Sequence, residues 1–175
     1  MGNSSRGLRG STFEDLINLT NERYRNNSLA IVQKIPTPIT PVAIDKESRT
    51  ITLAYFEKKG TVDYIGAVQG IPICFDAKET RQKNFPINNI HRHQIEFMEA
   101  YTQQKGVAFM LVNFLLYNQY FFLPFTQLKI FWDAAQNGGR KSIAHGDFEI
   151  KYLVEHKGGY LRYLDAINVY LEDNT

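Results

Sequence analysis

The longest apolar segment of the chain, residues 107–125, constrains the fold more than any other feature of the sequence. Its length would suffice to cross a bilayer. Three polar residues and a proline interrupt it, namely Asn113, Asn118, Gln119 and Pro124. These interruptions favour two buried strands joined by a turn over a membrane span. We therefore expect a globular, soluble protein with no membrane partner.

The remaining segments alternate between helical and strand patterns. A helix is expected to begin near Ser11, because residues 11–14 match a capping box. Further helices are expected over residues 88–104, 126–137 and 160–172. Strands are expected over residues 28–34, 61–68, 71–78, 107–116, 120–124 and 148–155. The order predicts a mixed α/β fold without internal repeats.

Two segments stand apart from this pattern. Residues 1–10 are rich in Gly, Ser and Arg, and we expect a flexible basic lead there. Residues 39–56 resemble two extended arms around a polar tip at residues 45–48, as in a protruding β-hairpin. No linker is long enough to divide the rest, so residues 11–175 are expected to form a single domain.

The charge of the chain does not exclude a nucleic-acid ligand. The formal net charge is only +2, but a DNA site needs basic residues gathered on one face rather than a high total. Candidates are Arg6 and Arg9 in the lead, and Arg140 and Lys141 in a Gly-Gly loop. That loop could hold a phosphate with its backbone amides. It could equally be a helix C-cap followed by a solvated basic turn.

Cys74 is the only cysteine of the chain, which excludes an intramolecular disulfide framework and a Cys-rich zinc site. It lies in an apolar stretch, where a packed thiol is expected. The N-terminus lacks the apolar core of a signal peptide. A cytoplasmic setting fits these features.

Asp63 and the run Asp76-Ala77-Lys78 are the central candidates for chemistry. If residues 75–78 form a strand, Asp76 and Lys78 project from the same face. Thr61 and Asp63 would share a face of the partner strand by the same rule. A hairpin could then bring together two carboxylates, a hydroxyl and an ammonium.

That grouping suits metal-assisted hydrolysis of a phosphodiester. Carboxylates bind Mg²⁺, which acidifies a bound water, and a neighbouring lysine can orient the water or stabilise the transition state. The alternative is a set of ion pairs on a polar sheet face. The apolar neighbours of Asp76 argue against that alternative, because a buried charge must be paired or bound to metal.

Other polar residues could support this site. Gln94 falls inside the apolar stripe of the helix at residues 88–104, so its amide needs a partner: a carboxylate, a metal-bound water or a backbone group. Glu14 could supply a third carboxylate, although its capping-box position explains it without catalysis. His91 and His93 are expected to point in different directions, which argues against a two-histidine metal site. One of them could contact DNA or cap the helix.

Tyr55 and Phe56 lie near the base of the hairpin expected at residues 39–56. They could stack on unpaired bases, but packing in the core is the expectation we favour.

These motifs occur together, and in this order, in one known family. Residues 60–66 (GTVDYIG), 75–80 (FDAKET), 91–94 (HRHQ) and 139–143 (GRKSI) resemble the RecU Holliday junction resolvases. Residues 34–39 (KIPTPI), 54–56 (AYF) and 85–86 (FP) match as well. Together the matches cover roughly residues 11–170, which is far more specific than the acidic motif alone.

The resemblance implies a restriction-endonuclease-like fold of the PD-(D/E)xK class, with a mixed central sheet flanked by helices. It implies that residues 39–56 form the family's stalk, which enters the junction centre. By motif, the Mg²⁺ site would consist of Thr61, Asp63, Asp76 and Gln94, and Mn²⁺ would be a plausible substitute. Lys78 would stabilise the transition state. Many relatives have Glu at the position of Asp76, and the side chain of Asp is one methylene shorter than that of Glu.

The resemblance also implies an enzyme that resolves Holliday junctions by paired symmetric cuts in recombination and repair. Two identical cuts suit a two-fold homodimer. Lys46 and Arg49 in the stalk, and His93, join the candidate DNA contacts. Recombinase and branch-migration proteins are expected partners, at a nucleoid-associated, cytoplasmic location. Two alternatives stay open: a repair nuclease of the same class with broader substrates, and a non-catalytic junction-binding or recombinase-modulating protein.

Overall fold

The computed structural model describes residues 11–56 and 61–174. Its centre is a six-stranded mixed sheet with the strand order β1–β4–β5–β7–β8–β10. In chain order these are β1 (Ile31–Lys34), β4 (Tyr64–Val68), β5 (Ile71–Thr80), β7 (Val107–Phe114), β8 (Gln119–Pro124) and β10 (Leu153–Val154). Only β5 and β7 pair in parallel within this sheet. A parallel pair needs a long crossover, and α2 (Arg92–Gln103) lies in it.

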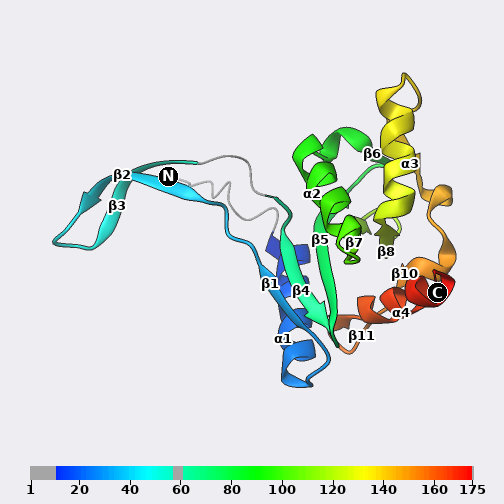
Figure 1. Cartoon of the computed structure of the whole chain (residues 1–175), viewed down its shortest axis with the longest axis horizontal. Helices are drawn as coiled ribbons and strands as arrows, with labels where there is room; N and C mark the ends of the chain where they lie inside the picture. The colour runs from blue at the N-terminus through cyan, green and yellow to red at the C-terminus, as the bar shows by residue number, and fades with distance from the viewer. Residues whose placement is uncertain (1–10, 57–60, 175) are drawn as a thin grey trace.

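Helices cover both faces of the sheet (Figure 1). Side chains of α1 (Ser11–Asn26) and α4 (Tyr163–Asp173) form one hydrophobic layer with the sheet. Side chains of α2 and α3 (Phe125–Gln136) form the other. Every residue of β7 is buried, because this strand has a layer on each side and needs no polar face.

A row of stacked aromatic rings crosses the sheet beneath α1 and α4. Tyr64, Phe75, Phe109 and Phe122 lie on successive strands, and their ring centroids are 4.7, 4.7 and 4.5 Å apart. Cross-strand aromatic contacts of this kind stabilise a sheet beyond the area they bury. They fix β4 against β5, and thereby the residues at the start of β4.

Buried hydrogen bonds tie the first helix to the last helix and to the residues just before it. The hydroxyl of Tyr24 donates to the carbonyl of Leu161 at 2.6 Å, and the hydroxyl of Tyr163 donates to Asn21 Oδ1 at 2.6 Å. The Leu161 N–H donates to Thr20 Oγ1 at 3.0 Å. These bonds satisfy polar groups that would otherwise be costly in the interior.

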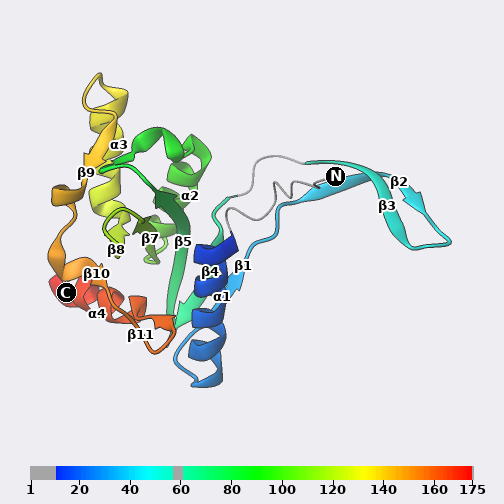
Figure 2. The ribbon, with the colours of Figure 1, turned by 180° about the vertical axis from the view of Figure 1, so that it is seen from behind.

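A β-hairpin projects from the body of the molecule (Figures 1 and 2). It consists of β2 (Ile39–Asp45) and β3 (Thr50–Phe56), which form a sheet of their own. We call this hairpin the stalk. Two smaller pairs complete the strands: β6 (Asn84–Pro86) with β9 (Ser142–Ala144), and β11 (His156–Lys157) with β12 (Tyr160–Leu161).

The predicted architecture is confirmed: a mixed sheet flanked by helices, with a protruding hairpin. Residues 107–125 contribute two buried strands joined by a turn, as expected. Within the described residues no helix has both the length and the apolar character of a membrane span. Cys74 is buried and unpaired, as a packed thiol should be.

Several predicted boundaries were wrong, each for a local reason. The strand expected at residues 28–34 begins only at Ile31, because Ser28 adopts a left-handed conformation with φ of 56° after α1. The helix expected at residues 88–104 begins at Arg92, after a short 3-10 turn over Ile87–Asn89. The helix expected from residue 160 begins at Tyr163, because Tyr160 pairs with Lys157 in a strand.

Two further expectations were wrong. Most of the strand expected at residues 148–155 is irregular, and only Leu153–Val154 joins the sheet, after a 3-10 turn at Ile150–Tyr152. Core packing of Tyr55 and Phe56 is also excluded, since they are 58% and 76% exposed. The predicted flexible lead at residues 1–10 lies outside the described residues.

Candidate active site

Asp63 and Asp76 meet where β4 begins. Tyr64 pairs with Phe75, so Asp63 stands opposite Asp76 at the next position of the register. The Asp63 N–H donates to Asp76 Oδ1 at 3.1 Å, and the Ala77 N–H donates to Asp63 Oδ2 at 3.1 Å. Each carboxylate thus accepts a hydrogen bond from a backbone N–H of the segment that carries the other carboxylate. The two acidic side chains converge, as the sequence pattern predicted.

Lys78 completes the group. Alternation along β5 places its side chain on the face of Asp76, and its Nζ lies 2.5 Å from Asp76 Oδ2. The Asp76 side chain is entirely buried, whereas that of Lys78 is 20% exposed. The ammonium therefore lies between a buried carboxylate and solvent. A charge placed there compensates Asp76 and can also reach a bound substrate.

Gln94 is buried in α2 and faces the same carboxylate. Its Nε2 donates to Asp76 Oδ2 at 2.8 Å, and its Oε1 accepts the N–H of His91 at 3.0 Å. Because an ionised carboxylate only accepts and a backbone N–H only donates, these two partners fix which end of the amide faces which. The expectation that this inward-facing amide needs a partner is met by Asp76.

The environment of Asp76 changes its protonation. The pKa of this carboxyl is raised to about 7. Burial is the main cause; the ammonium of Lys78 lowers the pKa, and the carboxylate of Asp63 raises it. Desolvation and a like charge both disfavour the ionised form. Burial also raises the pKa of the Cys74 thiol to about 12, so that this neighbour stays protonated and takes no part.

Thr61 does not lie where we predicted. The strand β4 begins at Tyr64, so Thr61 and Asp63 belong to the segment before it and do not share a strand face. The reason is that the Asp63 N–H donates to the side chain of Asp76, at 3.1 Å, and not to the backbone of β5. Thr61 nevertheless lines a cavity of about 140 Å³ together with Asp63, His93 and Gln94.

The same cavity has a wall that sequence reasoning did not assign. Ile35, Pro36 and Thr37 line it, and they connect β1 to the stalk. The signal was present, because Pro36 and Pro38 cannot continue a strand and mark a turn at this point. The backbone N–H of His91, which orients Gln94, could not be found from residue types.

The donor set fits a hard divalent cation. Two carboxylates and a hydroxyl are oxygen ligands of the kind that Mg²⁺ prefers, whereas the Gln94 amide presents its nitrogen to Asp76. Two carboxylates beside one ammonium also leave negative charge in a buried place, which a cation would offset. In the part of the chain that the structure describes, no cluster of three or more His, Cys, Asp or Glu side chains exists that could hold a metal.

Glu14 lies at the edge of this site and is half exposed. Its carboxylate pairs with the ammonium of Lys34, the residue before Ile35. Burial is the main cause of the raised pKa of Tyr64, and the negative charges of Glu14, Asp63 and Asp76 raise it further.

The two histidines correct an expectation. Their rings stack with centroids 5.5 Å apart and an angle of 11°. They do not point in different directions because His91 precedes α2 in an extended conformation. His93 lines the cavity beside Asp63 and Gln94, whereas His91 is exposed.

The predicted DNA contacts have different environments. Lys46 and Arg49 lie in the exposed turn at the tip of the stalk. Arg140 pairs with Asp147 and donates through Nε to the Ser142 carbonyl at 2.7 Å, while Lys141 donates to the Ala135 carbonyl. Arg6 and Arg9 lie outside the described residues.

The Gly-Gly loop is a helix C-cap, which agrees with one of its two interpretations. The Gly139 N–H donates to the Ala134 carbonyl at 2.8 Å, and Gly138 has a φ of 86°. Its two cations are partly engaged by the protein, so the loop differs from a freely solvated basic turn.

Comparisons with known proteins identify relatives over almost the whole chain. The family model described as Recombination protein U, RecU, matches residues 8–169. The chain is 40% identical over 168 residues to the Holliday junction resolvase RecU of Limosilactobacillus reuteri (strain DSM 20016), covering 91% of this chain and 82% of that protein. It is 38% identical over 167 residues to the protein of the same name from Geobacillus sp. (strain WCH70), covering 93% and 83%.

Among solved structures, Archaeoglobus fulgidus Hjc, a Holliday junction resolvase, aligns with a TM-score of 0.41 and 9% identity. That alignment covers 67% of this chain and 78% of the other.

Proposed function

Because the chain belongs to the RecU family, we propose that it is a divalent-cation-dependent endonuclease that resolves Holliday junctions by paired, symmetric cuts. The observation that carries the chemistry is the buried Asp76 carboxylate, held by the Asp63 N–H, Gln94 Nε2 and Lys78 Nζ. A structure-selective hydrolase of DNA needs such an acidic centre with a cation beside it.

Asp63, Asp76 and Thr61 would hold the metal ion, which we propose to be Mg²⁺ with Mn²⁺ as a substitute. Gln94 would complete the set, because its Oε1 accepts one N–H and retains a second lone pair. When bound, the ion would acidify a water molecule and neutralise charge that develops on the phosphate. Glu14 could act as an accessory carboxylate only after releasing Lys34.

Lys78 would act on the scissile phosphate. Its ammonium is held at the edge of the buried carboxylate, where it needs no reorganisation to meet negative charge on a phosphate oxygen. Gln94 keeps Asp76 Oδ2 in place by donating to it, and His91 fixes the Gln94 amide in turn. Asp76 must be ionised to work, and its pKa of about 7 makes the unassisted site sensitive to pH near neutrality.

The DNA would be held by separate groups of residues. Lys46 and Arg49 would contact the junction from the tip of the stalk, and Arg6 and Arg9 from the lead. His93 would contact DNA at the catalytic cavity, which it lines. Arg140 and Lys141 would contact phosphates near α3. Contacts of this kind position the substrate without reading its sequence.

The active form would be a homodimer. A four-way junction has approximate two-fold symmetry, and a two-fold dimer presents two equal sites to opposed strands. We place the enzyme in the cytoplasm at the nucleoid, with a recombinase and branch-migration proteins as partners.

The decisive experiment compares Asp76→Asn with the wild type on a mobile four-way junction in Mg²⁺. The substitution removes the charge but keeps the shape, so cleavage should be lost while junction binding persists. Asp133→Asn is the matched control, because Asp133 is an exposed residue of α3 paired with Lys129. Retained cutting by Asp76→Asn would remove Asp76 from the chemistry. Equal cutting of linear duplex and junction by the wild type would overturn the structure-selective part.

A further inference from the structure

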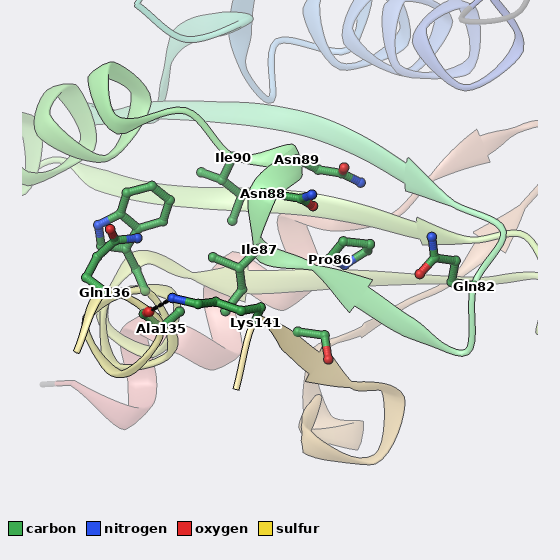
Figure 3. Close-up of a pocket in the computed structure, with 11 residues that line it drawn as sticks. Gln82, Pro86, Ile87, Asn88, Asn89, Ile90, Ala135, Gln136 and Lys141 are labelled. Atoms are coloured by element: carbon green, nitrogen blue, oxygen red, sulfur yellow. Dashed lines mark hydrogen bonds between the residues drawn. The ribbon is translucent and has the colours of Figure 1, made fainter. Parts of the chain in front are cut away.

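A second cavity, of about 660 Å³, lies between the segment that precedes α2 and the C-terminal end of α3 (Figure 3). Its volume is in the range of sites that bind small organic groups. Nothing in the proposed cleavage chemistry uses it, since the catalytic cavity is the smaller one around Asp63 and Gln94.

The lining of this cavity is rich in neutral hydrogen-bonding groups. Four side-chain amides contribute to it, those of Gln82, Asn88, Asn89 and Gln136. The half-buried indole of Trp132 and the ammonium of Lys141 lie among them. None of the described residues that line the cavity is acidic. The set therefore suits a flat, uncharged, hydrogen-bonding group that is attached to a negative charge.

These groups are available to a ligand. The side-chain hydrogen bond drawn in Figure 3 joins Lys141 Nζ to the Ala135 carbonyl, and an ammonium has two further N–H donors. Asn88, Asn89 and Gln136 are exposed. Their amides can donate and accept at the same time, which matches the edge of a nucleobase.

The cavity lies close to the catalytic carboxylates. Ile90 lines it, and Gln94, four residues later, donates to Asp76. Four residues span at most about 14 Å of extended chain. A DNA strand in a duplex rises about 3.4 Å per nucleotide, so about four nucleotides cover that distance. A strand cut at Asp76 that runs along this segment would therefore reach the cavity within about four nucleotides.

We propose that this cavity receives one unstacked base of the DNA substrate, within about four nucleotides of the scissile phosphate. Trp132 stacks on the base, Asn88 and Asn89 bond its edge, and Lys141 faces the adjoining phosphate. Stacking on an aromatic ring holds any base, whereas paired amide contacts favour adenine. The cavity would thus give the enzyme a sequence preference at the cut. This inference rests on the proposed junction-cleaving function.

The test uses the fact that Trp132 is the only tryptophan of the chain. The wild type is titrated in EDTA, which leaves the DNA uncut, with four-way junctions that carry an abasic site at successive positions around the cut. The intact junction should quench the tryptophan emission. One abasic position within about four nucleotides should abolish the quenching and weaken binding about tenfold.

The variant Asn88→Ala/Asn89→Ala should lose the difference between bases at that position, both in binding and in the choice of cleavage site. The matched control Gln103→Ala/Gln104→Ala removes two exposed amides from the other end of α2 and should keep the difference. Thermal unfolding of both variants checks that each is folded.

The inference is overturned if junctions bind, as a gel shift shows, yet no junction changes the tryptophan emission. It is also overturned if free adenosine monophosphate quenches as strongly as the junction, because the cavity is then a site for free nucleotides. Failure of the proposed function looks different: the junction does not bind, or Mg²⁺ added to the same samples produces no cutting.

Discussion

Asp76 lies in the middle of a strand in which each of the other residues from Ile71 to Ala77 is apolar, and its carboxylate is fully shielded from water. Such a charge is costly unless donors surround it. The Asp63 N–H, Gln94 and Lys78 supply three hydrogen-bond donors to the carboxylate. Burial nevertheless still disfavours its ionised form. A local conflict of this kind is expected at functional sites.

The first prediction concerns the pH dependence of stability without metal. The pKa of Asp76 is about 7 in the folded protein and near 3.8 in the unfolded chain. The protonated form therefore stabilises the fold below about pH 4, and this contribution is lost as pH rises through 7. Between pH 5 and 8 the wild type should lose about 3 kcal/mol relative to Asp76→Asn.

Urea unfolding of both proteins in EDTA, at pH 5 and pH 8, measures this difference. Added Mg²⁺ should restore stability to the wild type at pH 8 and have little effect on Asp76→Asn, because the cation favours the ionised carboxylate. Parallel pH profiles of the two proteins would contradict the assignment.

Residue types were sufficient to predict some of these contacts. Alternation along a strand placed Lys78 beside Asp76, and a lone amide in an apolar stripe pointed Gln94 at a polar partner. The place of Thr61 could not be predicted. Strand propensity does not show that Asp63 donates its backbone N–H to a side chain. Because of this bond, the strand pairing begins only at Tyr64.

At the scale of secondary-structure elements, β1 is the edge strand that leads into the cavity lined by Asp63 and Gln94. It pairs with β4, and the Ile35 N–H donates to the Asp63 carbonyl. Gly66 of β4 permits this approach. A Cβ at Gly66 would lie 2.2 Å from the Ile31 carbonyl oxygen and 2.8 Å from Val32 Cα. Backbone atoms cannot turn aside as a flexible side chain can.

Gly66→Ala should therefore destabilise the protein by about 3 kcal/mol, because β1 must move away from β4. Gly70→Ala is the matched control. Its φ of 91° disfavours a side chain, but no atom lies within 4 Å of the added Cβ, so the cost should be about 1 kcal/mol. Urea unfolding measures both values. Equal costs would show that β1 is not held as described.

Irregular elements were harder to predict than regular ones. Residues 107–125 fold as expected because buried strands depend mainly on apolar content. Ile150–Tyr152 form a 3-10 turn within the strand expected at residues 148–155, and a local bond explains this: the Tyr152 N–H donates to the Glu149 carbonyl. Hydrophobic periodicity does not register such contacts.

The stalk is an isolated hairpin with many exposed apolar side chains, including Val42, Ile44 and Leu53 at 57 to 59% exposure. A two-stranded hairpin alone is marginally stable in water. Its polar tip is ordered locally, since Asp45 Oδ1 accepts the Glu47 N–H at 2.9 Å. The tip is thus suited to carrying Lys46 and Arg49 away from the body.

Replacing Lys46 and Arg49 together by Ala should weaken junction binding by about tenfold or more, and linear duplex binding much less. The reason is that only a branched substrate presents phosphates to the tip of the stalk and to the body at once. Lys105→Ala/Lys157→Ala, two exposed lysines outside the stalk, is the control for general charge loss. Gel shifts at one fixed salt concentration measure the affinities of the wild type and of both variants for both substrates. An equal loss on both substrates would refute the stalk role.

At the scale of the whole molecule, a short connection joins the stalk to the cavity that Asp63 lines. Residues 35–37 line this cavity, and β2 of the stalk begins at Ile39. If DNA contacts the stalk as proposed, it would lie close to Asp63 and Asp76. A net charge of +2 would then suffice, because Lys46 and Arg49 stand at the exposed tip of the stalk.

Residues 11–56 and 61–174 contain a single such centre, so paired cuts by the proposed mechanism would use two chains. If the enzyme acts as a two-fold dimer, mixing wild-type and Asp76→Asn subunits should produce heterodimers that cut one strand only. Nicked junctions should then accumulate at the expense of resolved duplexes, and an equal mixture should contain about half heterodimers if exchange is complete. The products are separated on native and denaturing gels, with subunit exchange checked by mass. An independently acting monomer would behave differently: the inactive subunit would merely dilute the active one, and the ratio of nicked to resolved product would stay unchanged on mixing. The ratio therefore tests the symmetric assembly separately from the chemistry of Asp76.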